Sequence, residues 1–389
     1  MTEFKSGRHF LQIPGPSNVP DRILHAIGHP TIDHRGPEFQ KLSEEVLLGS
    51  RRIFKTSGSV IIFPTSGTGA WEAALMNTLS PGDQVLMFET GHFATLWHNM
   101  AVKFGLEVDF VPTNWRHGVD PQIVEDKLKA DTEHQVKSVN IVHNETSTGV
   151  TSRVAEIRQA IDNANHPALF MVDTISSLGS VDYRHDEWKV DVTVGCSQKG
   201  LMLPPGLGFN AISEKALQRS QVNGFTRHFW DWGDMLNANV NYFYPSTPCT
   251  NLLFGLRESI RMLEEEGLDN VFARHARFGE ATRRAVRSWG LEILCEEPLE
   301  YSPVLTAVMM PEAKGADALR KIILEKFNMS LGNGLGKVAD RVFRIGHLGD
   351  LNDLSLIGTL AGVEMGLSLG KITHRPGGVA SAMEYLRSA

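Results

Sequence analysis

The feature that most limits the fold of this chain is a regular alternation of short apolar runs with helical patterns between residues 59 and 196. Apolar, β-branched runs of this length predict strands, here at 59–63, 84–88, 107–111, 138–143, 168–173 and 191–196. Apolar residues at helical spacing predict the intervening helices, here at 67–79, 92–104, 121–129 and 153–164. This order predicts an α/β fold with a mostly parallel central sheet covered on both faces. In such sheets ligands bind at the carboxyl ends of the strands.

The chain is also long enough for more than one hydrophobic core, since it has 389 residues. Its beginning is punctuated by prolines and a glycine, which predicts an extended arm. The pattern changes near Cys249, where a long helix begins, and the strands and helices beyond it predict a smaller α/β unit. We therefore expect an N-terminal arm, a large domain and a small C-terminal domain, over residues 1–20, 21–254 and 255–389.

Two reactive side chains follow predicted strands at the ligand-binding edge of the sheet. Asp173 ends one apolar run, and Lys199 follows the run 191–196 among small residues. A lysine can form a Schiff base with an aldehyde cofactor and an aspartate can bind a pyridinium nitrogen, which are the two protein groups that pyridoxal phosphate needs as an electron sink. Each residue also has an ordinary interpretation, because a strand-end aspartate often caps a turn and such a lysine is usually solvated.

Small residues at the start of the helix 67–79 predict an anion site. Ser66, Gly67 and Thr68 leave backbone N–H groups free at a helix N-terminus, where a phosphate binds well. Gln198 could reach the same phosphate. An ordinary turn between strand and helix is the alternative. The polar segment 144–149 follows another strand, where its hydroxyl groups either bind a cofactor oxygen or form a polar turn.

Arg344 lies within an apolar run, between Phe343 and Ile345. Its neighbours predict partial burial, and a buried arginine needs an anion. A substrate carboxylate held by two hydrogen bonds is one partner for it. A structural aspartate or glutamate is the other.

A set of short segments spans nearly the whole chain: Pro14-Gly15-Pro16-Ser17-Asn18, Ser66-Gly67-Thr68-Gly69-Ala70-Trp71-Glu72, His143-Asn144-Glu145-Thr146-Ser147-Thr148-Gly149, Val172-Asp173, Ser197-Gln198-Lys199, Pro204-Pro205-Gly206 and Arg344-Ile345-Gly346. In this order and spacing the set resembles the alanine/serine–glyoxylate aminotransferases, in the class V branch of fold-type I pyridoxal phosphate (PLP) enzymes. The resemblance implies the fold-type I architecture, PLP as cofactor and a homodimer with shared active sites.

The resemblance also implies a role for each matched residue. Lys199 is the implied Schiff-base lysine and proton shuttle, and Asp173 the partner of the pyridinium. The other implied contacts to the cofactor are Phe93 and Ile175 on the two ring faces, Thr146 at the phenolic oxygen, Ser66, Gly67, Thr68 and Gln198 around the phosphate, and Tyr244 and Thr247 from the second subunit. Arg344 is the implied clamp for the substrate carboxylate, and Asn18 lies with it in the substrate site.

The implied reaction moves an amino group from serine or alanine to glyoxylate, giving glycine and a 2-oxo acid by a ping-pong mechanism. Arg35 and Arg227 leave the donor open. If these arginines form a second anion site, they would suit a dicarboxylate donor such as aspartate. If they form ion pairs at the surface or at an interface, they say nothing about the donor. A lyase of the cysteine desulfurase branch needs a nucleophilic cysteine, which residues 331–340 lack. A binding module that uses PLP only structurally is a third alternative.

Composition narrows the class of protein further. The 38 Lys+Arg against 45 Asp+Glu give a net charge of −7, which argues against nucleic acid as the main partner. No apolar run reaches the length of a membrane helix. The three cysteines are widely spaced, which favours a reducing compartment. Histidines show no metal-ligand spacing, so no metal site is expected. With no signal-peptide pattern at the N-terminus, we expect a cytoplasmic protein.

Overall fold

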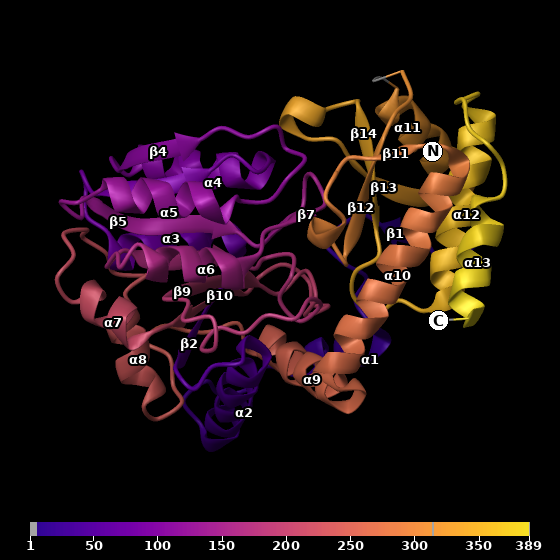
Figure 1. Ribbon diagram of the computed structural model, residues 1–389. Coiled ribbons are helices and arrows are strands. Elements are labelled where there is room, and N and C mark those ends of the chain that lie inside the picture. The colour runs from indigo at the N-terminus through magenta and orange to yellow at the C-terminus, as the bar shows by residue number, and fades with distance from the viewer. Residues whose placement is uncertain (1–5, 313–314, 389) are drawn as a thin grey trace.

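The computed structural model describes residues 6–312 and 315–388. Within them the larger part of the molecule is built on a sheet of seven strands (Figure 1). In spatial order these are β2 (Ser59–Phe63), β10 (Gly208–Ile212), β9 (Val192–Cys196), β8 (Leu169–Asp173), β5 (Val136–Val142), β3 (Gln84–Phe88) and β4 (Glu107–Val111). The strands from β9 to β4 pair in parallel, and only β10 runs against its neighbours β9 and β2. The predicted mostly parallel sheet is confirmed.

Helices cover both faces of this sheet because successive strand residues point to opposite sides. On β3, Val85 and Met87 pack with α3 (Gly67–Thr78) and α4 (His92–Lys103). Leu86 and Phe88 point the other way and pack with α5 (Pro121–Ala130) and α6 (Val154–Asn163). The strands are therefore buried on both sides, and polar side chains gather at their ends.

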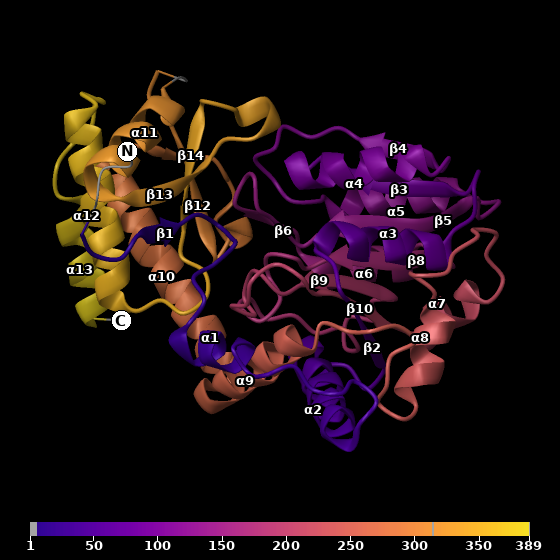
Figure 2. The same ribbon diagram turned by 180° about the vertical axis from the view of Figure 1, so that it is seen from behind.

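The smaller part contains a sheet of five strands. In spatial order they are β1 (Phe10–Gln12), β13 (Met329–Asn333), β14 (Val342–Gly346), β12 (Leu305–Met309) and β11 (Glu292–Ile293). The helices of this part are α10 (Leu268–Trp289), α11 (Ala316–Phe327), α12 (Asp353–Leu369) and α13 (Gly378–Ser388), which pack beside the sheet (Figure 2). The N-terminal segment, expected to be an extended arm, also supplies an edge strand, because the backbone of Phe10–Gln12 pairs in parallel with β13.

The predicted boundary between residues 254 and 255 falls inside α9 (Thr250–Glu266). This helix packs against α1 (Asp21–Ile27) and α2 (Pro37–Phe54), and its buried leucines belong to the core of the larger part. The structure therefore places α9 with the large domain as one unit. The change to the small domain comes along α10, whose residues from Phe278 onward join the second core.

The strand β10 has no counterpart among the elements predicted from the sequence. The remaining elements are short. They are α7 (Glu214–Ser220), α8 (Trp232–Asn239), β6 (Asn144–Glu145), β7 (Val150–Thr151) and the 3₁₀ turns Pro298–Glu300 and Gly336–Val338. Across the described residues, the model contains no helix with the length and apolar character needed to span a membrane.

Candidate active site

Lys199 lies just beyond the end of β9 and is buried, with 8% of its surface exposed. Its Nζ donates a hydrogen bond to the carbonyl oxygen of Pro14 at 2.5 Å. Gly15 makes this contact possible, because its φ is +93° and a Cβ there would lie 2.3 Å from the Lys199 side chain. Burial lowers the pKa of Lys199 to about 8. The amine is therefore far easier to deprotonate than a solvated lysine.

Asp173 is the last residue of β8, the strand beside β9, and its side chain is buried. Its Oδ1 accepts a hydrogen bond from the backbone N–H of Ile175 at 2.6 Å. Burial raises the pKa of Asp173 to about 7, and the nearby charge of Glu145 acts in the same direction. No lysine, arginine or histidine of the described chain forms an ion pair with this carboxylate. A cationic ring nitrogen would supply the charge it lacks.

The predicted anion site lies at the start of α3, and its role stays a prediction. Ser66 is the N-cap residue, and its side chain forms no capping hydrogen bond, so the first N–H groups of the helix are not satisfied by it. Gly67 is buried under Ile175, since a Cβ on this glycine would lie 2.3 Å from Ile175 Cδ1. Thr68 is exposed at the same turn. On the segment after β9, the side-chain oxygen of Gln198 is buried and has no hydrogen-bond partner among the described residues.

Arg344 reaches the site from the other sheet. It lies on β14 with 5% of its surface exposed, and its Nη1 donates to the carbonyl oxygen of Thr146 at 2.7 Å. Its Nε donates to the carbonyl oxygen of Asn333 at 2.8 Å. Among the described residues no carboxylate forms an ion pair with this guanidinium, and burial lowers its pKa to about 10. The sequence left two partners open for Arg344, a substrate carboxylate and a structural aspartate or glutamate. The described residues form no ion pair of the second kind.

Glu145 is a residue of the site that the sequence interpretation missed. It is buried, and its carboxylate accepts hydrogen bonds from the backbone N–H of Ala94 at 3.0 Å and the hydroxyl of Ser147 at 2.6 Å. It also accepts from the N–H of Phe93 at 3.4 Å. Glu145 therefore caps the first turn of α4, which carries the partly buried Phe93. The available signal was an acidic residue in a segment that follows a buried strand.

Two residues predicted for the substrate site show no contact with the groups above. Asn18 uses its amide to donate to the carbonyl oxygen of Leu11 at 3.1 Å, within the N-terminal segment. Arg35 is exposed. Their predicted roles in binding substrate stay predictions.

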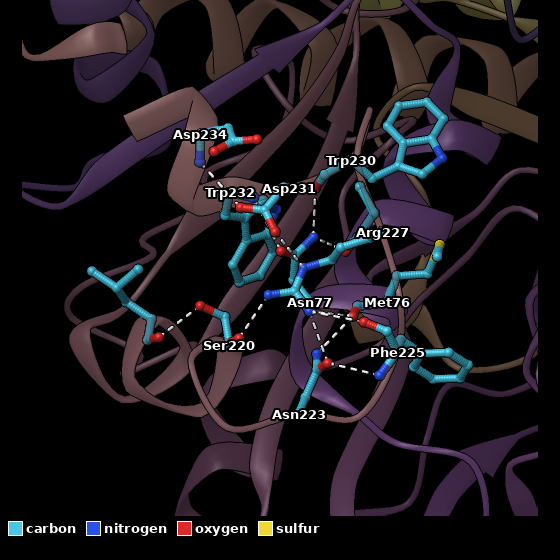
Figure 3. A network of polar contacts seen from close by, with 12 residues as sticks. Met76, Asn77, Ser220, Asn223, Phe225, Arg227, Trp230, Asp231, Trp232 and Asp234 are labelled. Carbon is cyan, nitrogen blue, oxygen red and sulfur yellow. Dashed lines mark hydrogen bonds and ion pairs between the residues drawn. The ribbon is translucent and has the colours of Figure 1, made fainter. Parts of the chain in front are cut away.

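Arg227 is bound to its own loop and to the end of α3, as Figure 3 shows. Its Nη2 donates to the carbonyl oxygen of Ser220 at 2.7 Å, and its Nη1 to Oδ1 of Asn223 at 2.8 Å. Asp231 forms an ion pair with its Nε at 3.1 Å, and 11% of the side chain is exposed. This geometry favours pairing within the protein over a site for a second substrate carboxylate, because Nη1 and Nη2 already donate hydrogen bonds and Asp231 already pairs with the charge of the guanidinium.

Tyr244 and Thr247 lie on the segment that precedes α9. The hydroxyl of Tyr244 is buried in this chain and its ring packs edge-on against Phe39, with centroids 6.0 Å apart; burial raises the pKa of its phenol. Thr247 is exposed. Their contribution to the site of a second subunit stays a prediction.

These side chains fit the groups of PLP. A buried aspartate that lacks a cation matches a pyridinium nitrogen, and a buried lysine with a lowered pKa matches an aldehyde carbon. The free N–H groups at the start of α3 match a phosphate. Such a constellation at the ends of parallel strands defines a PLP-dependent transferase of the fold-type I architecture.

Residues 10–335 match the model of the class-V aminotransferases, and the chain belongs to this family of PLP-dependent enzymes. It is 46% identical to the serine–glyoxylate aminotransferase of Methylorubrum extorquens, over 98% of this chain and 97% of that protein. It is 44% identical to the L-aspartate–glyoxylate aminotransferase of Paracoccus denitrificans, over 96% and 95%. Its fold is similar to the crystal structure of a ureidoglycine–glyoxylate aminotransferase from Bacillus subtilis, with a TM-score of 0.90, 25% identity and coverage of 99% and 100%.

The described residues contain no group of three or more His, Cys, Asp or Glu side chains placed to hold a metal ion. The cysteines are free, and burial raises the pKa of both Cys196 and Cys295 to about 12. Neither thiol is therefore activated as a nucleophile at neutral pH.

Proposed function

We propose that this enzyme moves an amino group from a small L-amino acid, with serine as the first candidate, to glyoxylate. The observation that carries the proposal is the buried guanidinium of Arg344, near Lys199, with which no carboxylate of the described chain forms an ion pair. Every α-amino acid and every 2-oxo acid supplies the carboxylate that this guanidinium lacks. Relatives over almost the full chain are named for glyoxylate as a substrate.

In this proposal PLP, when bound, acts as the electron sink that stabilises a carbanion at the substrate α-carbon. Arg344 holds the substrate carboxylate and so fixes which bond at the α-carbon faces the cofactor. Lys199 accepts the α-proton at Nζ, a role suited to an amine whose pKa burial lowers to about 8. Asp173 keeps a proton on the pyridinium nitrogen. Glu145 holds the first turn of α4 and with it Phe93.

The donor is proposed to carry a single carboxylate. Arg227 donates hydrogen bonds to Ser220 and Asn223 and forms an ion pair with Asp231, which leaves this arginine poorly suited to a second substrate carboxylate. Aspartate remains the second candidate, because one relative is named for it and Arg35 is exposed. A desulfurase activity is disfavoured, since residues 331–340 contain no cysteine and burial keeps Cys196 and Cys295 protonated.

We further propose a homodimer in which Tyr244 and Thr247 complete the phosphate site of the second subunit. The exposure of Thr247 in the single chain supports this assignment. A cytoplasmic location also remains part of the proposal.

A panel of half-reactions tests the function. The PLP form is mixed in turn with serine, alanine and aspartate, and loss of the cofactor absorption band and formation of each 2-oxo acid are followed. Glyoxylate is then added and glycine is measured. Serine is expected to react fastest. A band lost only with aspartate would overturn the donor assignment, and absence of glycine formation from any donor would overturn glyoxylate as acceptor.

A further inference from the structure

Trp71 lies on α3, beyond its anion-binding start, and has no role in the site described so far. Its indole Nε1 donates a hydrogen bond to Oδ2 of Asp173 at 3.1 Å. We infer that Trp71 is a positioning residue for Asp173, which orients the carboxylate and favours its charged form, so that cofactor binding and proton retention on the pyridinium depend on this indole.

The two oxygens of Asp173 are held by different parts of the chain. Oδ1 accepts from the N–H of Ile175 on the segment after β8, and Oδ2 accepts from Trp71 on the helix α3. Trp71 is 2% exposed and its ring stacks on Trp97, with centroids 5.9 Å apart and planes at 10°. The buried indole, through its hydrogen bond, fixes the plane of the carboxylate. Because an indole N–H can donate but not accept, its bond is stronger when the carboxylate is ionised.

The surroundings of Asp173, taken together, oppose its ionisation, so the hydrogen bond from the Trp71 indole affects its protonation state. Lys199, after β9, favours the charged carboxylate, whereas burial and Glu145 on β6 oppose it, with a net rise of its pKa to about 7. Cys196 on β9 stays a thiol because burial raises its pKa to about 12, and His143 after β5 stays neutral because burial lowers its pKa to about 4. Ile175 and Trp71 supply the hydrogen bonds that act against the rise. Of these two donors, only Trp71 can be removed by substituting a side chain.

The neighbouring indole offers a matched control. Trp97 is buried like Trp71, but its Nε1 has no hydrogen-bond partner among the described residues. Trp71→Phe and Trp97→Phe therefore remove similar volume and one N–H each, and only the first removes a hydrogen bond to Asp173.

The test compares these two variants by titrating the apoenzyme with PLP across pH. Trp71→Phe is expected to weaken the Kd for PLP about tenfold, which corresponds to about 1.4 kcal/mol, near the low end for a hydrogen bond to a charged group. The acid limb of the affinity profile should move up by about one pH unit, since the charged form of Asp173 becomes harder to reach. Trp97→Phe should change neither quantity. Equal behaviour of the two variants would overturn the inference.

A second measurement applies if Trp71→Phe does not fold. In ¹⁵N-indole-labelled protein, one indole resonance should titrate with Asp173 and move when PLP is added, and this titration should be lost in Asp173→Asn. Indole signals indifferent to Asp173→Asn would overturn the inference. It rests on PLP binding and not on the identity of the donor. An enzyme that binds PLP but uses another amino donor would therefore contradict only the proposed function. If wild type binds PLP and Trp71→Phe binds it with the same Kd, only this inference is contradicted.

Discussion

The Nζ of Lys199 donates a hydrogen bond to the carbonyl oxygen of Pro14, 2.5 Å away, although the two residues belong to segments attached to different sheets. Pro14 follows the edge strand of the small sheet, and Lys199 follows a central strand of the large one. Ser17 adds a second link, because its hydroxyl donates to the carbonyl oxygen of Lys199 at 2.8 Å. The N-terminal segment therefore holds the reactive lysine directly.

Lys199→Ala is expected to remove transamination to trace levels and to leave a folded protein, because the change deletes the amine without opening the core. Activity and circular dichroism are the measurements, with the exposed Lys41→Ala as control. Borohydride reduction of the wild-type protein with PLP should label the peptide that contains Lys199. A label on another lysine would contradict the assignment.

Arg344→Ala is expected to lower kcat/KM for serine, alanine and glyoxylate alike, because all three carry the carboxylate that the guanidinium binds. A charge-assisted pair lost from a buried site corresponds to about 2–5 kcal/mol, or about 30- to 4,000-fold in kcat/KM. Arg341→Ala, at the exposed residue just before the same strand, is the control and should stay near wild type. A loss confined to one substrate would argue against a general carboxylate clamp.

Arg227→Ala is expected to lower thermal stability rather than to change the choice of donor. The substitution leaves Asp231 and the carbonyl oxygen of Ser220 without their partner, at a cost of about 1–3 kcal/mol in the free energy of unfolding. The exposed Arg35→Ala should leave the melting temperature of the protomer unchanged. Both variants should keep the wild-type ratio of serine to aspartate activity, and a selective loss of aspartate turnover in either one would identify a second carboxylate site.

Thr247→Ala is expected to weaken PLP affinity even though Thr247 lies on the surface of the single chain. The reason is its proposed contact with the phosphate bound in the second subunit, where a lost hydrogen bond to a charged group corresponds to about 1.5–3 kcal/mol. The Kd for PLP is the measurement, and the neighbouring exposed Ser246→Ala is the control. Unchanged affinity would remove Thr247 from the phosphate site.

Asp173→Asn is expected to bind PLP but to lose most activity, because a neutral amide cannot keep the pyridinium protonated. In the apoenzyme, by contrast, Asp173→Asn should raise the stability of the fold at neutral and higher pH. The folded protein raises the pKa of Asp173 from 3.8 to about 7, so the fold loses stability as pH rises from about 4 to about 7, where the unfolded chain releases this proton more readily than the folded one.

The melting temperature of the apo variant should therefore equal that of the wild-type apoprotein near pH 4 and exceed it at pH 8. The corresponding gain in the free energy of unfolding at pH 8 is at most about 4 kcal/mol. Thermal unfolding of both apoproteins across this pH range is the measurement. A melting difference that does not depend on pH would contradict the raised pKa.

The local pattern of the sequence was sufficient for most elements of the large domain. The strands predicted at 59–63 and 84–88 match β2 and β3, and the helix predicted at 121–129 matches α5, where the side chain of Asp120 is the N-cap and accepts from the N–H of Gln122. Apolar periodicity and capping are short-range signals, so they can be seen without tertiary contacts. The same strand ends made Asp173 and Lys199 predictable as neighbours at one edge of the sheet.

Other features depend on contacts between distant segments. The stretch Gly208–Ile212 has a composition with weak strand propensity. It forms β10 because its backbone pairs with β2 on one side and β9 on the other. Segment Phe10–Gln12 becomes β1 only because β13 offers a parallel edge.

The sequence by itself determined the order of elements and the chemistry of the residues that follow the strands. Only the tertiary structure decided the partners of those residues: Pro14 for Lys199, Trp71 for Asp173, and the protein's own loop for Arg227. The physical reason is that local propensity acts over a few residues, whereas a buried polar side chain is satisfied by whichever group the packing of distant segments brings within hydrogen-bonding distance.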